Sequence, residues 1–316
     1  MYDTLNMKYY ADDIDGVSLL EEVPTRLNPD TLSEHQYNGG GYVIVAGKLG
    51  TLDVSVSRCR VKVSDSSFAK YFFGSPYKVM GRKDMQVCLE KLSDELHLPM
   101  DRAEVTRLDF GQNFVMKAGT GVYLNHLGIL KGTTRKPLGD GLYYSGKNVE
   151  IAFYNKNREQ TRAGNPIPEL YKGKQVLRYE CRYLHRLPEL LDVPQMTANL
   201  LFNESFYIRL VDMWERNFNA IQKLGDTNIN FEHMTTKREL YRAALLNLIE
   251  QRGGQLAFTE SIVEAAKMGK VTAKQKHDLL AAVEDACKID ATGLVVDNEC
   301  VKELEAKIKQ ATKFYR

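Results

Sequence analysis

The stretch that most constrains the fold runs from residue 149 to residue 159, with the sequence VEIAFYNKNRE. Apolar and polar residues alternate along it, which predicts a β-strand with one buried face. The apolar face carries Val149, Ile151 and Phe153, and the opposite face carries Glu150, Ala152, Tyr154 and Lys156. A tyrosine and a lysine on one face suit the attack of a phenol oxygen on a phosphate. A lone Tyr-x-Lys is nevertheless more often an ordinary solvated strand end.

Two further stretches repeat this alternation. In VTRLDFGQNF (105–114), Arg107 and Asp109 lie opposite the apolar residues, and in VLRYECRYL (176–184) the polar face carries Arg178, Glu180 and Arg182. If the three strands share one antiparallel sheet, Asp109, Tyr154 and Glu180 converge on its polar face. An amphipathic helix predicted over 82–97 would cover the apolar face.

The pattern as a whole predicts an α+β fold in two parts. Residues 1–190 form an antiparallel-sheet domain with helices on one face, and residues 191–316 form an all-helical domain. The second part carries helical spacing over 203–224, 258–268, 272–288 and 297–314. DNA binding, oligomerisation and partner recruitment are all open roles for it.

Composition limits the class of protein. The net charge of +2 is too small to indicate a nucleic-acid binder by itself, so any basic surface must be local. The five cysteines show no CxxC spacing, which argues against zinc and disulfide frameworks. The sequence has no signal core and no apolar run of about 18 residues, so we expect a cytoplasmic protein without a membrane partner.

A local basic surface is predicted on a strand pair over 42–63. The parity of its apolar residues changes midway, and a bulge near Ser57 would restore one buried face. Arg58, Arg60 and Lys62 then form a basic stripe that could hold a phosphate backbone. A solvated strand face explains the same pattern about as well.

The polar face also predicts chemistry. Asp109 and Glu180 are oxygen ligands suited to Mg²⁺ or Mn²⁺, although ion pairs with Arg107 and Arg178 would explain them equally well. Tyr154 is the candidate nucleophile, and a free phenol has a pKa of about 10, so it needs a nearby cation or base. Lys156, Arg178 or Arg182 could supply the charge, and Glu159 could take a proton or contact the metal.

The motifs RLDFGQN, YYSGKNVEIAFYNKNREQ and LRYECRY, in this order, resemble rolling-circle replication initiators. The chain is most similar to the phage and plasmid replication proteins of the gene II/X group, which are related to the Rep_trans plasmid initiators. The resemblance covers about residues 1–190. It implies an endonuclease that nicks one strand at an origin, links Tyr154 to the 5′-phosphate and leaves a 3′-OH to prime synthesis.

The resemblance also implies a later reversal of this chemistry, for which a second nucleophile is needed. Tyr143 and Tyr144 are candidates, whereas Tyr179 is expected in the core. The chain lacks the His-apolar-His metal motif of the larger superfamily, so its metal ligands would be carboxylates. Single-stranded or origin DNA is the expected partner, with a host helicase and a second copy of the chain as further partners. The expected DNA contacts are Arg58, Arg60, Lys62, Arg107, Lys147, Arg178 and Arg182.

Three rival functions fit parts of the sequence. A non-catalytic DNA-binding replication regulator would use the basic residues but not Tyr154. A relaxase or transposase-type nuclease would use the same tyrosine chemistry in another process. A structural phage protein would have no need of polar faces on three successive strands. DNA strand cleavage separates the enzymes from the other two.

Overall fold

The alternating stretches form one antiparallel sheet of ten strands in the order β2-β3-β4-β5-β1-β6-β10-β9-β8-β7. The computed structural model describes residues 1–11, 19–37, 42–224, 236–288 and 299–316. The strands are β1 (Tyr2–Tyr10), β2 (Ser33–Tyr37), β3 (Tyr42–Leu49), β4 (Leu52–Ser57), β5 (Arg60–Ser67), β6 (Glu104–Met116), β7 (Thr134–Leu138), β8 (Gly141–Ser145), β9 (Val149–Asn155) and β10 (Gln175–Tyr183).

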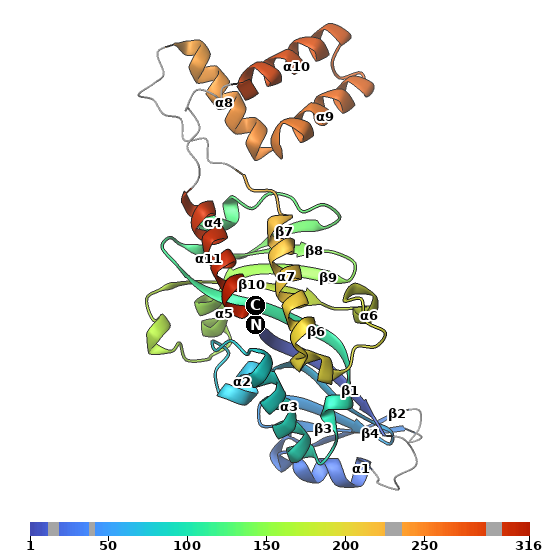
Figure 1. Ribbon diagram of the computed structural model, residues 1–316. Coiled ribbons are helices and arrows are strands. Elements are labelled where there is room, and N and C mark those ends of the chain that lie inside the picture. The colour runs from blue at the N-terminus through green and yellow to red at the C-terminus, as the bar shows by residue number, and fades with distance from the viewer. Residues whose placement is uncertain (12–18, 38–41, 225–235, 289–298) are drawn as a thin grey trace.

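The helices are grouped by their position in the chain (Figure 1). Within and directly after the sheet segments lie α1 (Leu19–Glu22), α2 (Phe68–Phe73), α3 (Arg82–Leu96), α4 (Thr120–Asn125), α5 (Lys156–Arg162) and α6 (Leu187–Leu190). The C-terminal part holds α7 (Glu204–Asn219), α8 (Lys237–Gln251), α9 (Gly254–Lys267), α10 (Ala273–Cys287) and α11 (Glu299–Tyr315). The predicted α+β class is thus confirmed.

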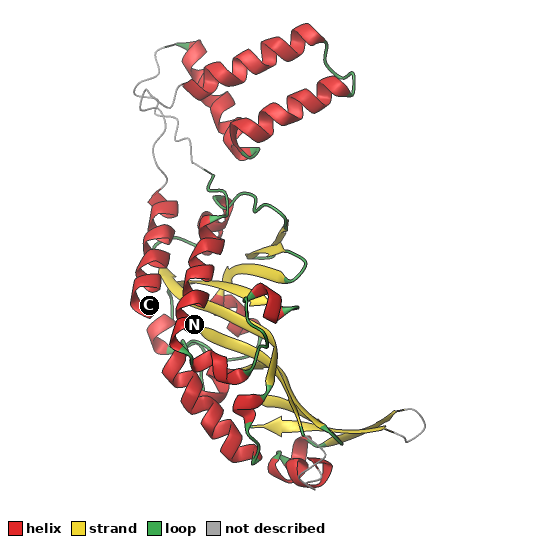
Figure 2. Ribbon diagram, turned by 45° about the vertical axis from the view of Figure 1, so that its right-hand side comes forward, coloured by secondary structure: helices red, strands yellow, loops and turns green. Residues whose placement is uncertain are grey.

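One face of the sheet is covered by helices, as Figure 2 shows. The predicted amphipathic helix is α3, and its apolar side chains are buried against the sheet. Aromatic rings continue this core: the Phe153 ring stacks on Tyr179 at 4.6 Å, and Tyr179 stacks on Trp214 of α7 at 4.8 Å. Burial of such rings is a large apolar contribution to stability.

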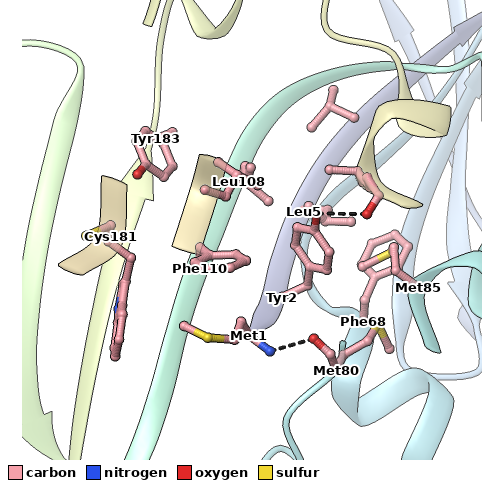
Figure 3. Close-up of a cluster of buried hydrophobic side chains, with 14 of the residues drawn as sticks. Met1, Tyr2, Leu5, Phe68, Met80, Met85, Leu108, Phe110, Cys181 and Tyr183 are labelled. Carbon is pink, nitrogen blue, oxygen red and sulfur yellow. Dashed lines mark hydrogen bonds between the residues drawn. The ribbon is translucent and has the colours of Figure 1, made fainter. Parts of the chain in front are cut away.

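The first strand lies near the middle of the sheet, between β5 and β6. Figure 3 shows its side chains in the core: Tyr2 packs on Phe110 of β6, and Leu5 and Met1 lie beside it. The N-terminal amine donates a hydrogen bond to the Met80 carbonyl. The start of the chain is therefore fixed at the centre of the fold.

The C-terminal helices divide between two cores. Trp214 and Phe218 of α7 and Leu304 and Ile308 of α11 belong to the core of the sheet. Helices α8, α9 and α10 share a separate small core around Ile249, Ile262, Val283 and Ala286. The domain boundary near residue 190 stays a prediction, but side chains from both sides of it fill the sheet's core.

One detail differs from the sequence expectation. The parity change after Val56 comes from a turn at residues 58–59 between β4 and β5, where Ser57 pairs with Arg60, and not from a bulge. A two-residue turn resets the alternation as a bulge would, so the pattern alone could not distinguish them. Across the described ranges, no helix combines the length and the apolar character needed to cross a bilayer.

Candidate active site

The polar face of the sheet is hollowed where β1, β6, β9 and β10 meet helices α2 and α5. A pocket of about 230 Å³ lies there, and Asp109, Tyr154 and Glu180 all line it. The strand register explains why they meet. Asp109 pairs with Arg182 across β6 and β10, and Tyr154 pairs with Arg178 across β10 and β9. The convergence predicted from three alternating strands is present.

Gly111 of β6 makes room for this arrangement. It lies directly opposite Glu180 in the register of β6 and β10. A Cβ atom at position 111 would lie 2.4 Å from the Glu180 Cβ and 2.6 Å from the Tyr179 carbonyl oxygen. Any side chain here would therefore displace the strand that carries Glu180.

Tyr154 is held by a hydrogen bond from its hydroxyl to Glu180 Oε2, at 3.2 Å. The side chain is largely buried, with 9% of the residue exposed. Burial, followed by the negative charge of Glu180, raises the pKa of Tyr154 well above its ordinary value. The resting phenol is therefore neutral, and an attack by its oxygen requires that the proton leave toward an acceptor.

Glu180 accepts the hydrogen bond of the Tyr154 hydroxyl, and two guanidinium groups hold its carboxylate. Arg178 Nε lies 2.8 Å from its Oε2, and Arg182 Nη2 lies 2.6 Å from its Oε1. Burial opposes ionisation, but Arg178 and Arg182 outweigh it and lower the pKa of Glu180. Glu180 therefore remains an anion although it is only 2% exposed.

Asp109 forms a bidentate ion pair with Arg107, at 3.0 Å from Nε and 2.9 Å from Nη2. Burial is the largest influence on its carboxyl group, and the charge of Glu180 acts in the same direction. Together they raise the pKa of Asp109 despite Arg107. The two carboxyl groups of the pocket thus differ in how readily they hold a proton.

Lys156 and Glu159 reach the pocket from a helix, which corrects the prediction that Lys156 continues the strand. The strand ends at Asn155, whose side chain accepts a hydrogen bond from the Arg158 amide and so caps α5. Lys156 is the first residue of α5, and its Nζ lies 3.0 Å from Glu159 Oε2. Its Nζ also lies 5.8 Å from the centre of the Tyr154 ring. A cation near the phenol is therefore present, as expected.

The two predicted metal ligands are fully engaged by arginines. Both carboxylate oxygens of Asp109 accept from Arg107, and those of Glu180 accept from Arg178 and Arg182. Within the described part of the chain, no three His, Cys, Asp or Glu side chains form a group that could hold a metal ion. In this arrangement the two carboxylates do not fit a divalent cation. Binding of Mg²⁺ or Mn²⁺ stays a prediction.

The predicted DNA contacts fall into three groups. Arg178 is only 2% exposed and is paired with Asp3 and Glu180, so it holds the site together and presents no surface to DNA, contrary to expectation. Arg107 and Arg182 are about a quarter exposed at the pocket. Exposed positions away from the pocket are occupied by Lys147 in the β8–β9 turn and Arg58 in the β4–β5 turn, while Arg60 and Lys62 lie partly exposed on β5.

The two candidates for a second nucleophile lie on opposite faces. Tyr143 pairs with Ala152 and lies on the polar face, with the Arg182 guanidinium 5.7 Å from its ring centre. Tyr144 is fully buried on the helix-covered face and donates to the Gly128 carbonyl at 2.8 Å, so the structure does not bring it to the pocket. Tyr179 is a core residue, as expected.

Asp3 is a site residue that the sequence reasoning missed. Its carboxylate accepts from Ser67 at 2.6 Å and from Arg178 at 2.7 Å, so it fixes the arginine that holds Glu180. A charged residue inside an otherwise buried opening strand was the available signal. Lys70, Gln160 and Asn165 also line the pocket, but they come from helices and loops whose position no strand pattern predicts.

The sequence was compared with models of known protein families and with curated proteins. A family model that describes the N-terminal part of the phage replication-associated protein of the gene II type matches residues 1–217, which include the whole sheet and most of α7. None of the curated proteins compared with the chain matches it. The match supports a phage replication initiator, a class of protein that acts on DNA. The chain belongs to the family of phage replication-associated proteins of the gene II type.

Proposed function

We propose that this protein nicks and rejoins one strand of DNA at a replication origin through a covalent link between Tyr154 and a 5′-phosphate. The observation that carries the proposal is the hydrogen bond from the Tyr154 hydroxyl to Glu180 inside a pocket lined by cationic side chains. A nucleophile within reach of an acceptor that a third group orients is the usual arrangement for covalent catalysis.

The reaction balances within the residues of the pocket. The Tyr154 oxygen attacks the phosphorus atom, a new O–P bond forms and the P–O3′ bond breaks. The phenol proton passes to Glu180 Oε2, which then returns it to the departing 3′-oxygen. Because Arg178 and Arg182 make Glu180 a weak base, the proton moves together with formation of the O–P bond. Rejoining is the same sequence in reverse.

Four cations line the pocket beside four carboxylates, and the cations are the groups suited to hold a phosphate. Arg107, Arg182 and Lys156 line the pocket beside Tyr154. Guanidinium groups match phosphate oxygens in geometry, and charge that develops on those oxygens in the transition state is stabilised by fixed cations. Arg182 also stacks near Tyr143, which keeps Tyr143 as the proposed second nucleophile.

Formation of a protein–DNA adduct tests the proposal. Purified protein is incubated with single-stranded DNA that includes the phage's own origin, with Mg²⁺, with Mn²⁺ and with EDTA, and adducts that survive boiling in detergent are counted. We expect an adduct that Tyr154→Phe loses and that Tyr144→Phe, the matched control, keeps. The EDTA sample tests the predicted metal. An intact wild-type protein that binds this DNA tightly without any adduct would favour the regulator instead.

A further inference from the structure

Two lysines on the polar face of the sheet stand side by side, and Glu104 of β6, which is paired with Lys8 on its other side, forms no ion pair with it in the part of the chain that the structure describes. Lys8 of β1 and Lys62 of β5 are directly paired across the two strands. Like charges at such positions repel each other and destabilise a sheet. Neither lysine forms an ion pair or a side-chain hydrogen bond within the described ranges, although both are only partly exposed. An anion that bound between the lysines would relieve this repulsion.

The lysines are continuous with the candidate active site. From β9, which carries Tyr154, the strand order passes through β10, β6 and β1 to β5. Tyr154 is level with Asn113 of β6 in the register, whereas Lys62 is level with Glu104, nine residues away along the strand. At about 4.8 Å per strand and about 3.3 Å per residue, Tyr154 and Lys62 are therefore roughly 35 Å apart. Arg107 of β6 lies between them, paired in the sheet with Asn6 of β1. A chain of phosphates that leaves the pocket across this face therefore meets cations at both ends of the path.

The surface beyond the lysines has a floor of small side chains. A shallow pocket of about 260 Å³ lies over β3, β4 and β5. Ala46, Ser55 and Ser64 line it, and the ion pair of Lys48 and Asp53 lies beside them. Ser55 pairs with Lys62 in the sheet, so the floor adjoins the lysine pair. Small residues let a polynucleotide backbone approach the sheet closely.

An aromatic ring stands at the end of this path. Tyr10 of β1 is 50% exposed and pairs with Arg60 of β5. Exposed aromatic rings next to basic residues bind unstacked bases, which single strands offer and duplexes do not. The ring therefore favours a single-stranded ligand over a duplex.

We propose that the polar face of β1, β5 and β4 binds the single-stranded DNA next to the nick, with phosphates on Lys8 and Lys62 and a base on Tyr10. This inference rests on the proposed function, because it assigns a path to the strand that Tyr154 cleaves. It differs from the expected basic stripe, since it adds Lys8 and Tyr10 and leaves out Arg58 in its exposed turn.

Binding measurements in a Tyr154→Phe background test the path without cleavage. Fluorescence anisotropy compares a single-stranded oligonucleotide with its duplex for Lys8→Gln/Lys62→Gln. The matched control is Lys83→Gln/Lys313→Gln, two exposed lysines on α3 and α11 of the helical layer. We expect the first pair to weaken single-strand binding at least tenfold and to reduce the salt slope by about 1.4, or about 0.7 per lost phosphate contact. The control should bind as the parent does.

A Tyr10→Ala variant tests the stacking, with an expected loss of about 5- to 100-fold for the single strand and little change for the duplex. Equal binding by the lysine pair and its control would overturn the path, and so would equal losses for single strand and duplex. Thermal unfolding shows that each variant is folded. Adduct formation by the protein with Tyr154 intact is scored separately. A missing adduct contradicts the nicking reaction, whereas unchanged binding contradicts only the path.

Discussion

The two faces of the sheet are built from alternate residues of the same strands, yet they do opposite things. On β9 and β10, Phe153 and Tyr179 stack in the core, while their neighbours Tyr154 and Glu180 meet in the pocket. The first pair contributes burial of apolar area. The second pair belongs to a buried network of ion pairs. Burying these charges costs solvation free energy, and only the ion pairs and hydrogen bonds within the network offset that cost.

The helix-covered face of the sheet therefore contributes mainly to stability, and the polar face holds the residues of the proposed reaction. Replacing a residue on the helix-covered face should cost stability and leave the chemistry of the folded fraction intact. Replacing a residue on the polar face should lower the nicking rate by more than the loss of folded protein explains. Substitutions at neighbouring residues of the same strands test that separation.

The largest effect on chemistry short of losing the nucleophile is expected from Glu180→Gln. The amide keeps the shape but cannot take the phenol proton, so we expect nicking to fall by about 10²- to 10⁴-fold. Nicking rates of folded protein, measured on a pre-melted origin strand, check this. Arg82→Gln, in the helical layer, is a control that removes one charge elsewhere. A nicking rate within twofold of wild type would remove Glu180 from the reaction.

The largest effect on stability is expected from Phe153→Ala. The ring is fully buried between Tyr179 and Phe218, and its loss leaves a cavity that should lower the free energy of unfolding by about 3–5 kcal/mol. Tyr154→Phe, one residue along the strand, removes one hydroxyl that donates to an anionic carboxylate, and should lower the free energy of unfolding by about 1.5–3 kcal/mol. Urea denaturation compares the two. Equal losses would mean that the faces do not divide the two tasks.

A smaller effect is expected from pH. The pKa of Asp109 is raised by burial to about 7, whereas an unfolded aspartate titrates near 3.9. The folded protein therefore holds a proton that the unfolded chain has lost, and this group makes stability fall as pH rises from about 4 to about 7. The slope is at most about 1.4 kcal/mol per pH unit. Denaturation of wild type and Asp109→Asn over this range should show a flatter profile in the variant.

The convergence of Asp109, Tyr154 and Glu180 could be predicted from sequence because alternation alone assigns a residue to a face. The same reasoning could not show which side chains on that face are covered. Arg178 was expected to contact DNA, but it is buried and forms an ion pair with Asp3, which lies more than 170 residues away in the sequence. Register between distant strands decides such contacts, and alternation carries no information about it.

The helical part shows the same limit. Helical spacing predicted α7, but not that Trp214 would stack on Tyr179 and so join the sheet's core. Nor could it show that α11, at the far end of the chain, would return to the same core while α8, α9 and α10 form another. Packing of this kind depends on long-range contacts. Recruitment of a helicase and formation of a homodimer by the helical part stay predictions.

Identifying the residue that carries the DNA tests the central claim most directly. The adduct formed on an origin-containing single strand is digested with nuclease and protease, and the modified peptide is sequenced by mass spectrometry. The account predicts a nucleotide 5′-phosphate on Tyr154, with Tyr143 modified, if at all, only after a second transfer. A first-formed adduct on any other residue, with Tyr154 unmodified, would contradict it.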